Sequence, residues 1–272
     1  MKKIVSLLLA LLMVGAVFAG CSSAPATDGD ATETQAAADS DLAYVKANGK
    51  LVIGITDFEP MDYKDANGEW IGFDADMAKA FAQELGVTAE FVEIDWDNKV
   101  LELDGKTVDC IWNGMTLTEE VKAAMSTSEP YCNNAQVVIV KADVADKYAD
   151  AEACKELNFA VESGSAGQQQ AEAYEFKFTE VKDQATALME VASGTCDAAI
   201  IDSLMAAAMV GEGTSYQDLT YTVSLNSEEY GVGFRTGSDI TAEFNAFLSK
   251  VKADGSIDTI AEKYGVQAAL IK

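Results

Sequence analysis

The sequence predicts an α/β protein made of two similar halves with largely parallel sheets. Short apolar runs of strand length alternate with segments whose apolar residues recur every three to four positions, as in amphipathic helices. A short internal echo supports two halves, because residues 101–109 and 189–197 each read as a helix end, a Gly, an Asp and the start of an apolar strand. Alternation of this kind is typical of sheets covered by helices.

The first half opens with a strand expected at residues 51–55. Four large apolar side chains then recur at a spacing of four and share one helix face: Phe73, Met77, Phe81 and Leu85. We expect the Asp74 side chain to cap the start of this helix and Gly86 to end it. Further strands of this half are predicted at residues 90–94, 108–112 and 136–141.

The second half repeats the theme. A strand is expected at residues 157–161, followed by the turn Glu162-Ser-Gly-Ser-Ala-Gly167 and a helix that ends at Tyr174. The remaining elements are a helix at 184–192 ended by Gly194, a strand at 198–201, a helix at 204–210, a strand at 230–234 and helices at 240–252 and 256–264.

The N-terminus indicates export. Two lysines precede an apolar run from Ile4 to Phe18, which is the pattern of a secretory signal and is too short for a permanent membrane span. The segment Phe18-Ala-Gly-Cys21 resembles the bacterial lipobox, with Phe where Leu is usual. Residues 1–20 are therefore predicted to be a lipoprotein signal peptide, with Cys21 lipidated after cleavage. Ordinary secretory cleavage beside a chance Cys is the alternative.

Residues 21–40 are predicted to be a disordered tether. Ser22 to Ser40 contains small and polar residues, with no aromatic and no large aliphatic side chain, so it cannot bury a core. A lipid at Cys21 would hold the folded body at the outer face of the cytoplasmic membrane.

Composition excludes several classes of function. The net charge is −26, and removing the two N-terminal lysines makes it −28, which argues against a nucleic-acid partner and against adhesion to anionic lipid. The chain has no His, which excludes Ser-His and Cys-His catalysis and His-ligated metals. We expect no metal and no cofactor. The disulfide state stays open for the four cysteines after Cys21: Cys110, Cys132, Cys154 and Cys196.

Seven motifs occur in order along residues 48–266. They are Leu51-Val-Ile-Gly-Ile-Thr-Asp-Phe-Glu-Pro-Met61, Gly72-Phe-Asp-Ala-Asp76, Asn113-Gly-Met-Thr-Leu-Thr118, Ser128-Glu-Pro-Tyr131, Val161-Glu-Ser-Gly-Ser165, Asp197-Ala-Ala-Ile-Ile-Asp202 and Tyr230-Gly-Val-Gly-Phe234. In this combination the chain resembles the family-3 extracellular solute-binding proteins, the polar amino-acid receptors of ABC importers.

The resemblance implies a type II periplasmic-binding-protein-like fold with a ligand cleft between two lobes. Lobe 1 is expected at residues 41–138 plus 232–272 and lobe 2 at 139–231, with hinge strands near 137–141 and 229–234. The ligand would sit at the carboxyl ends of the strands and be enclosed by lobe closure.

The implied function is transport binding and not catalysis. The protein would be a monomer that captures a polar amino acid and delivers it to the permease and ATPase subunits of an ABC importer. Three alternatives stay open: a receptor for a cationic amine without an α-carboxylate, a dehydratase-like enzyme on the same fold, and a sensor or adhesion module.

The ligand-binding residues implied by the resemblance are Asp57, Phe58, Trp96, Asn113, Gly114, Thr116, Gly164, Ser165, Ala166 and Asp202. Phe58 and Trp96 would sandwich the ligand, unless they are core residues. The Asn113–Thr116 segment would hold the head group, and the helix that opens at residues 164–166 would attract a carboxylate through its free N–H groups. Asp202 would pair with the α-ammonium, or cap the following helix.

One position departs from the family pattern. In the family's T-x-T-x-x-R motif an Arg grips the α-carboxylate, but here Val121 stands at that place and Lys122 would point elsewhere on a helix. The only arginine is Arg235. A carboxylate would then rely on Thr116, Ser165 and backbone N–H groups. Alternatively, aromatic and acidic side chains would cage a cation: Phe58, Trp96 and Trp112 with Asp57, Asp62 and Asp202.

Overall fold

A computed structural model of the chain describes residues 40–272. The predicted signal peptide, Cys21 and residues 21–39 of the predicted tether lie outside the described residues. The elements in chain order are α2 (Asp41–Asn48), β1 (Lys50–Ile55), β2 (Tyr63–Lys64), β3 (Trp70–Ile71), α3 (Phe73–Leu85), β4 (Thr88–Glu93), η1 (Trp96–Asn98), α4 (Lys99–Asp104), β5 (Cys110–Thr116), α5 (Glu119–Ala124), β6 (Ser126–Thr127), β7 (Cys132–Asn134), β8 (Gln136–Lys141), η2 (Ala142–Lys147), β9 (Asn158–Glu162), α6 (Ala166–Ala173), β10 (Lys177–Val181), α7 (Gln184–Ser193), β11 (Ala198–Asp202), α8 (Ser203–Met209), β12 (Leu219–Ser224), β13 (Glu228–Phe234), α9 (Ile240–Asp254), α10 (Ser256–Tyr264) and η3 (Gln267–Ala269).

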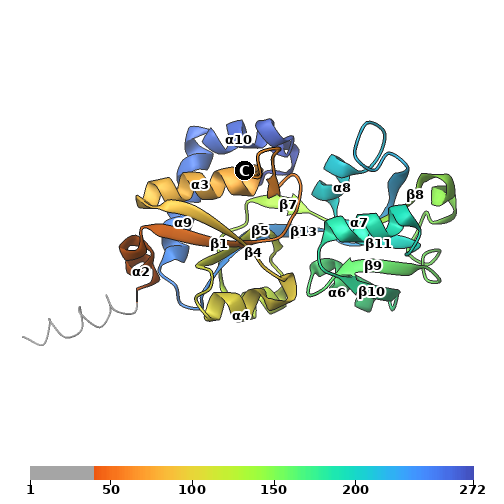
Figure 1. The fold of residues 1–272 in the computed structure, drawn as a ribbon, viewed down its shortest axis with the longest axis horizontal. Helices are drawn as coiled ribbons and strands as arrows, with labels where there is room; N and C mark the ends of the chain where they lie inside the picture. Colours follow the sequence, from red (N-terminus) through yellow and green to blue (C-terminus); the bar gives the residue numbers. More distant parts are fainter. Residues whose placement is uncertain (1–39) are drawn as a thin grey trace, which may run out of the picture. The chain divides into compact units, whose positions relative to one another are not determined.

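Two sheets with their own helices form the two lobes of this α/β fold. The first sheet has the order β4-β1-β5-β13-β6, with β7 also paired to β13, and the second has the order β10-β9-β11-β8-β12. Helices α3, α9 and α10 lie on one side of the first sheet and α4 on the other (Figure 1). We call the first sheet with its helices lobe 1 and the second sheet with its helices lobe 2.

The sheets are mixed, so the prediction of largely parallel sheets is only partly right. In lobe 1, β1 runs parallel to β4 and β5, whereas β13 runs antiparallel to β5. In lobe 2, β9 runs parallel to β10 and β11, whereas β8 runs antiparallel to β11 and β12. Strands β8 and β13 are the first strands after each crossing from one sheet to the other. Each is entered directly from a strand of the other sheet, without the crossover helix that a parallel connection within one sheet needs.

The chain crosses between the sheets a few residues before the expected hinges. β7 ends at Asn134 in the first sheet and β8 starts at Gln136 in the second, so the first crossing is at Ala135. The second crossing, at residues 225–227, lies between β12 and β13. Boundaries at 138/139 and 231/232 would instead cut through β8 and β13.

The helix predicted from the spacing of Phe73, Met77, Phe81 and Leu85 is α3, and all four side chains are buried. Gly86 ends it in the left-handed conformation at φ 77°, as predicted. The prediction that Asp74 caps the helix is wrong, because Gly72 occupies the N-cap position. Asp74 is buried inside the first turn, where its Oδ2 accepts hydrogen bonds from the Gly114 amide at 2.6 Å and the Tyr131 hydroxyl at 2.7 Å. It therefore fixes the start of α3 to β5.

The internal echo has a structural counterpart in the two lobes. Asp109 precedes β5 and accepts a hydrogen bond from the Val52 amide at 3.0 Å, on the parallel neighbour β1. Asp197 precedes β11 and accepts one from the Asn158 amide at 3.0 Å, on the parallel neighbour β9. Each carboxylate thus satisfies a backbone donor at the start of the adjacent strand.

Arg235 is a structural residue of lobe 1. Its guanidinium is buried and donates hydrogen bonds to the Asp41 carboxylate at 2.9 Å and to the Asp109 carboxylate at 3.1 Å. It also donates to the backbone carbonyls of Leu103 and Val108. The cysteines of residues 40–272 are buried and unpaired.

Candidate ligand-binding site

A cavity of about 380 Å³ lies between the two lobes. Its lobe 1 wall comes from η1, α4, β5 and α5, and its lobe 2 wall from the turn between β9 and α6 and the end of β11. Eight of the ten expected site residues line it: Trp96, Asn113, Gly114, Thr116, Gly164, Ser165, Ala166 and Asp202. These residues come from four separate stretches of the sequence, and the fold brings them to one place.

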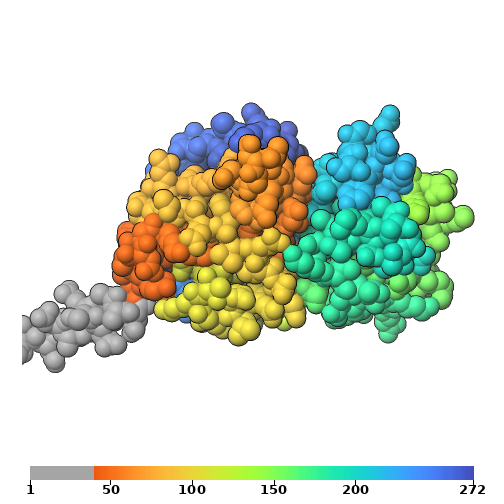
Figure 2. Space-filling model, viewed as in Figure 1, coloured from red at the N-terminus to blue at the C-terminus, as the bar shows by residue number. Residues whose placement is uncertain are grey.

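Segments from the two lobes also meet around the cavity. On the face shown in Figure 2, the yellow segment near residue 95 and the green to teal segment near residue 180 touch. Lys182 Nζ donates a hydrogen bond to Glu93 there at 2.7 Å. On α6, the Gln169 side-chain amide donates to the Glu120 carboxylate of α5 at 3.1 Å. The described arrangement is thus one in which the lobes contact each other.

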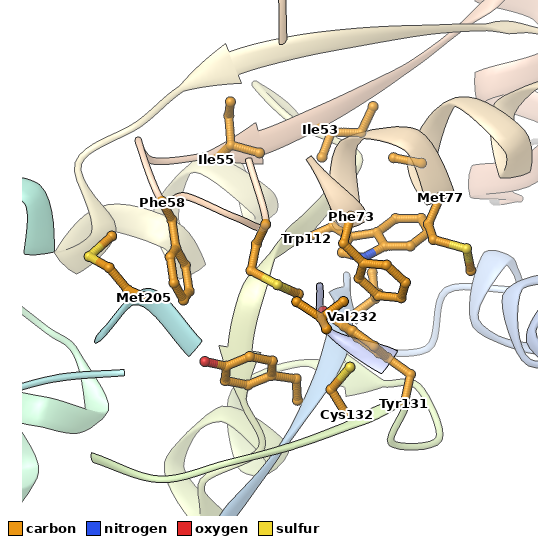
Figure 3. Close-up of a cluster of buried hydrophobic side chains, with 14 of the residues drawn as sticks. Ile53, Ile55, Phe58, Phe73, Met77, Trp112, Tyr131, Cys132, Met205 and Val232 are labelled. Atoms are coloured by element: carbon orange, nitrogen blue, oxygen red, sulfur yellow. The ribbon is translucent and has the colours of Figure 1, made fainter. Parts of the chain in front are cut away.

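Phe58 and Asp57 are the two expected residues that do not line the cavity. Phe58 is only 2% exposed and its ring meets that of Tyr230 edge-on, with centroids 6.4 Å apart. Figure 3 shows Phe58 beside Met205, which comes from α8 of lobe 2. Gly114 makes room for the ring, because a Cβ on Gly114 would lie 2.5 Å from Phe58 Cε1. Phe58 therefore packs behind the Gly114 segment in the core, while Asp57 is exposed on the loop that precedes it.

The proposed cation cage is not assembled around this cavity. Trp112 is buried, and its ring packs edge-on against Phe244 at 4.8 Å in the core of lobe 1. Asp62 is fully buried and also does not line the cavity. Of the six residues suggested for the cage, only Trp96 and Asp202 reach it.

The polar groups of the Asn113–Thr116 segment are engaged within the chain. Asn113 accepts a hydrogen bond from the Thr56 amide at 3.0 Å and donates one to the Thr56 hydroxyl at 2.8 Å. The Thr116 hydroxyl donates to Glu228 at 2.8 Å. These bonds fix the segment at the end of β5 against β1 and β13, which gives the cavity a rigid wall.

Asp202 stands at the carboxyl end of β11, in the centre of a hydrogen-bond network between the lobes. Its carboxylate accepts hydrogen bonds from the side chains of Asn134, Gln136, Gln184 and Tyr230. Although it occupies the N-cap position of α8, its side chain does not cap that helix. Burial, and then the neighbouring carboxylate of Glu228, raises the pKa of Asp202 to about 7.

The turn before α6 presents a helix start to the cavity. Ser165 is the N-cap of α6, and its hydroxyl accepts a hydrogen bond from the Gln168 amide at 3.1 Å. Gly164 adopts a φ of 71° and donates its amide to the Gln168 side chain at 2.8 Å. The first-turn amide of Ala166 has no acceptor inside the helix and stays available to an anion.

The cavity is also lined by two buried titratable residues, Glu162 and Lys99, which the sequence analysis did not predict as site residues. Glu162 ends β9, is 2% exposed and has no hydrogen-bond partner for its Oε1 atom. Burial, followed by the carboxylates of Asp202 and Asp183, raises the pKa of Glu162 to about 8. Lys99 opens α4 and is 8% exposed. Two features of the sequence could have indicated these site residues. Glu162 is an acid at the end of an apolar strand, and Lys99 follows Trp96 by one helical turn and so shares its face.

The cavity is strongly acidic. Its lining carries one cation, Lys99, among six carboxylates: Asp97, Glu120, Glu162, Glu172, Glu180 and Asp202. Such a field favours a ligand with positive charge. Among residues 40–272 there is no grouping of three or more Cys, Asp or Glu side chains that would hold a metal ion. No helix in the same range is long and apolar enough to cross a membrane.

The chain is similar to known proteins over almost its whole length. Residues 51–267 match the family described as bacterial extracellular solute-binding proteins, family 3. The glutamine-binding protein GlnH of a Bacillus subtilis ABC transporter is 32% identical over 271 residues, with 97% of each chain covered. The arginine-binding extracellular protein ArtP of the same organism is 27% identical, over 79% of this chain and 86% of its own.

Solved structures agree with the sequence comparison. The crystal structure of an ancestral amino acid-binding protein, described as a precursor of cyclohexadienyl dehydratase, superposes with a TM-score of 0.76 at 33% identity and covers 83% of this chain and 99% of its own. A substrate-binding protein of a Streptococcus pneumoniae ABC uptake transporter, solved with bound histidine, gives a TM-score of 0.77 at 26% identity and covers 86% and 100%. The chain therefore belongs to the bacterial extracellular solute-binding proteins of family 3.

Proposed function

We propose that the protein is the extracytoplasmic substrate-binding component of an ABC importer and that it captures a polar amino acid between its lobes. The observation that carries this function is the cavity of about 380 Å³, whose walls come from both lobes and include eight of the ten expected ligand residues. Relatives named for glutamine, arginine, histidine and cystine binding support an amino-acid ligand.

An amino acid with a cationic side chain fits the cavity best among polar amino acids. The ligand's α-carboxylate and α-ammonium cancel each other, so a neutral side chain would leave the acidic lining without a counter-charge. Glu162 supports this choice, because its unpartnered Oε1 offers a buried acceptor to a cationic group. Asp202 would hold the α-ammonium as part of its network with Gln136 and Gln184.

We infer binding and not catalysis at this site. The Ser165 hydroxyl caps α6 and the Thr116 hydroxyl donates to Glu228, so both are engaged in structural hydrogen bonds. Within residues 40–272, Ser165 is paired with no base, and Glu228, which accepts from Thr116, is itself held by hydrogen bonds from Asn134, Gln136 and Asn226. Lobe contacts such as Lys182 with Glu93 instead support enclosure of a ligand.

The anchor and the partners are part of the same proposal. Lipidation at Cys21 would tether a monomer to the outer face of the cytoplasmic membrane, within reach of the permease and ATPase subunits. Replacing Cys21 with Ser is expected to move the protein from the membrane fraction of its host to the medium, as measured by fractionation and immunoblotting. A Cys21→Ser protein that stays in the membrane fraction contradicts the anchor.

Ligand binding is tested by thermal unfolding with each of the twenty common L-amino acids, followed by calorimetric titration of those that stabilise. A ligand at 100 times its Kd stabilises the folded state by about 2.7 kcal/mol, which is a clear shift. Asp202→Ala should weaken the best ligand by more than about tenfold, since a hydrogen bond to a charged group contributes roughly 1.5–3 kcal/mol. Asp218→Ala, an exposed acid of lobe 2, is the matched control. The proposal fails if none of the twenty amino acids binds.

A further inference from the structure

Lys99 is a buried cation without a counter-ion. Its Nζ donates hydrogen bonds to two backbone carbonyls, that of Trp96 at 3.2 Å and that of Gly164 at 2.8 Å. Ion pairs within residues 40–272 involve other lysines and Arg235, and none of them includes Lys99. An ammonium group has three N–H donors, so one donor and the full charge remain for a group inside the cavity.

The surroundings of Lys99 make this arrangement costly without an anion. A buried charge is stabilised by a hydrogen-bonded ion partner, and carbonyl oxygens alone supply dipoles. Burial lowers the pKa of Lys99, and the carboxylates of Glu162, Glu120 and Asp97, none of which forms an ion pair with it, oppose that change. The centroid of the Trp96 ring also lies 5.0 Å from Nζ. An anionic group of the ligand would complete the site.

The position of Lys99 matches where a carboxylate would be held. Its bond to the Gly164 carbonyl places Nζ beside the turn that opens α6, whose first amides attract negative charge. Val121, which stands where the family pattern described in the sequence analysis implies a carboxylate-binding Arg, lines the same cavity. Val121 is 7% exposed and packs in one apolar cluster with Trp96, the residue that precedes Lys99 by one helical turn.

We propose that Lys99 binds the α-carboxylate of the amino-acid ligand, in place of the arginine that is missing at position 121. The assignment rests on the proposed function. Lys offers a compact charge and a single contact where Arg offers a planar pair of donors. Here the first-turn amides of α6 would supply the additional donors.

A competing role for Lys99 is a latch between the lobes, because its bond to Gly164 joins α4 to lobe 2. The two roles differ in what they do to ligands without a carboxylate. A latch stabilises the closed form for every ligand alike, whereas a carboxylate site acts only on ligands that carry the negative group.

The test compares the tightest-binding of the twenty common L-amino acids with its α-carboxamide, in which an NH2 group replaces one carboxylate oxygen and the negative charge is lost at nearly the same size. In the unaltered protein the amino acid should bind more than about tenfold more tightly than its carboxamide. Lys99→Met should weaken the amino acid by about 10- to 100-fold and change the carboxamide by less than about threefold. Lys122→Met, an exposed lysine next to Val121, should change neither affinity.

Two further variants keep the test decisive. Lys99→Gln removes the charge but keeps an N–H donor for the Gly164 carbonyl, so it should show the same selective loss even if Lys99→Met folds poorly. Adding Val121→Arg to Lys99→Met should restore the preference for the amino acid over its carboxamide. Folding of each variant is checked by its unfolding curve without ligand.

The outcomes separate this assignment from the function on which it rests. Equal losses for the amino acid and its carboxamide identify Lys99 as a latch and overturn the proposal, and so do unchanged affinities for both. In either case amino-acid binding by the unaltered protein still supports the proposed function. If the unaltered protein binds none of the twenty amino acids, both proposals fall together.

Discussion

Gly164 of lobe 2 lies directly against the backbone of Asp97 in lobe 1. A Cβ on Gly164 would be 2.7 Å from the Asp97 Cα atom, closer than side chains approach a backbone in folded proteins. The φ of 71° at Gly164 is also one that favours glycine. One wall of the cavity thus closes by backbone contact across the two lobes.

Gly164→Ala is therefore expected to prevent full closure. We predict an affinity loss of more than about tenfold for the amino-acid ligand, because the closed form loses at least about 1.4 kcal/mol relative to the open form. Small-angle X-ray scattering with saturating ligand should show a larger radius of gyration than for the unaltered protein. Gly213→Ala is the matched control, since Gly213 has a φ of 83° with open space around it. Equal effects of the two variants would assign the loss to backbone strain alone.

Glu162→Gln tests the acceptor for a cationic side chain. The change keeps the size of the side chain but removes a carboxyl group that can give up its proton and pair with a cationic ligand. It should therefore weaken arginine binding by about tenfold or more and leave glutamine binding within about threefold. Calorimetric titration with both amino acids gives the ratio directly. A parallel loss for arginine and glutamine would show that Glu162 does not distinguish them.

Glu162 also predicts how stability depends on pH in the absence of ligand. Its folded-state pKa of about 8 exceeds the ordinary value of 4.5, so the folded protein holds a proton that the unfolded chain releases between these values. The free energy of unfolding should therefore fall as the pH rises from about 4.5 to about 8. Asp202 and Asp74, each with a pKa raised to about 7, act in the same direction from about pH 4 to 7.

Urea unfolding at a series of pH values measures this dependence. In Glu162→Gln the decline should become shallower, most clearly between pH 7 and 8, where the contributions of Asp202 and Asp74 are complete. A stability that rises with pH over this interval, or an unchanged slope in the variant, would contradict the assignment.

Arg235→Met should destabilise lobe 1 without changing the choice of ligand. The substitution leaves the buried carboxylates of Asp41 and Asp109 without their guanidinium partner, which costs roughly 3–5 kcal/mol. Denaturant unfolding gives the loss, and the ratio of arginine to glutamine affinity at a temperature where the variant is folded gives the specificity. A changed ratio would place Arg235 in the binding machinery.

The sequence predicted helices and strands correctly where their buried residues form a regular apolar pattern. The helix expected at 256–264 is α10, and the strand expected at 136–141 is β8, with the same bounds. In contrast, β10 and β12 form the edges of the second sheet and carry several exposed residues, so they lack a continuous apolar run. Short elements such as β6 and β7 form only because β13 lies beside them.

The site followed from the sequence only in part, because a single sequence does not say which polar residues become buried. Phe58 was expected to contact the ligand unless it is a core residue, and the space left by Gly114 admits its ring into the core. Lys99 and Glu162 belong to residue types that are mostly exposed in proteins, yet they are only 8% and 2% exposed here. Their roles depend on segments more than sixty residues apart in the chain, as the Lys99–Gly164 hydrogen bond illustrates.

The burial of Arg235 also gives a way to measure how often lobe 1 unfolds, through cleavage at this residue. Because it is the only arginine in the sequence, a protease specific for arginine has one target, the bond to Thr236, and that target is closed off by the carboxylates of Asp41 and Asp109. Cleavage then requires lobe 1 to open locally or globally, and its rate at low protease concentration follows the population of the open form. For cleavage through global unfolding, an amino acid that binds should slow the cut by the factor 1 + [L]/Kd, which turns gel electrophoresis into a ligand screen that needs no label.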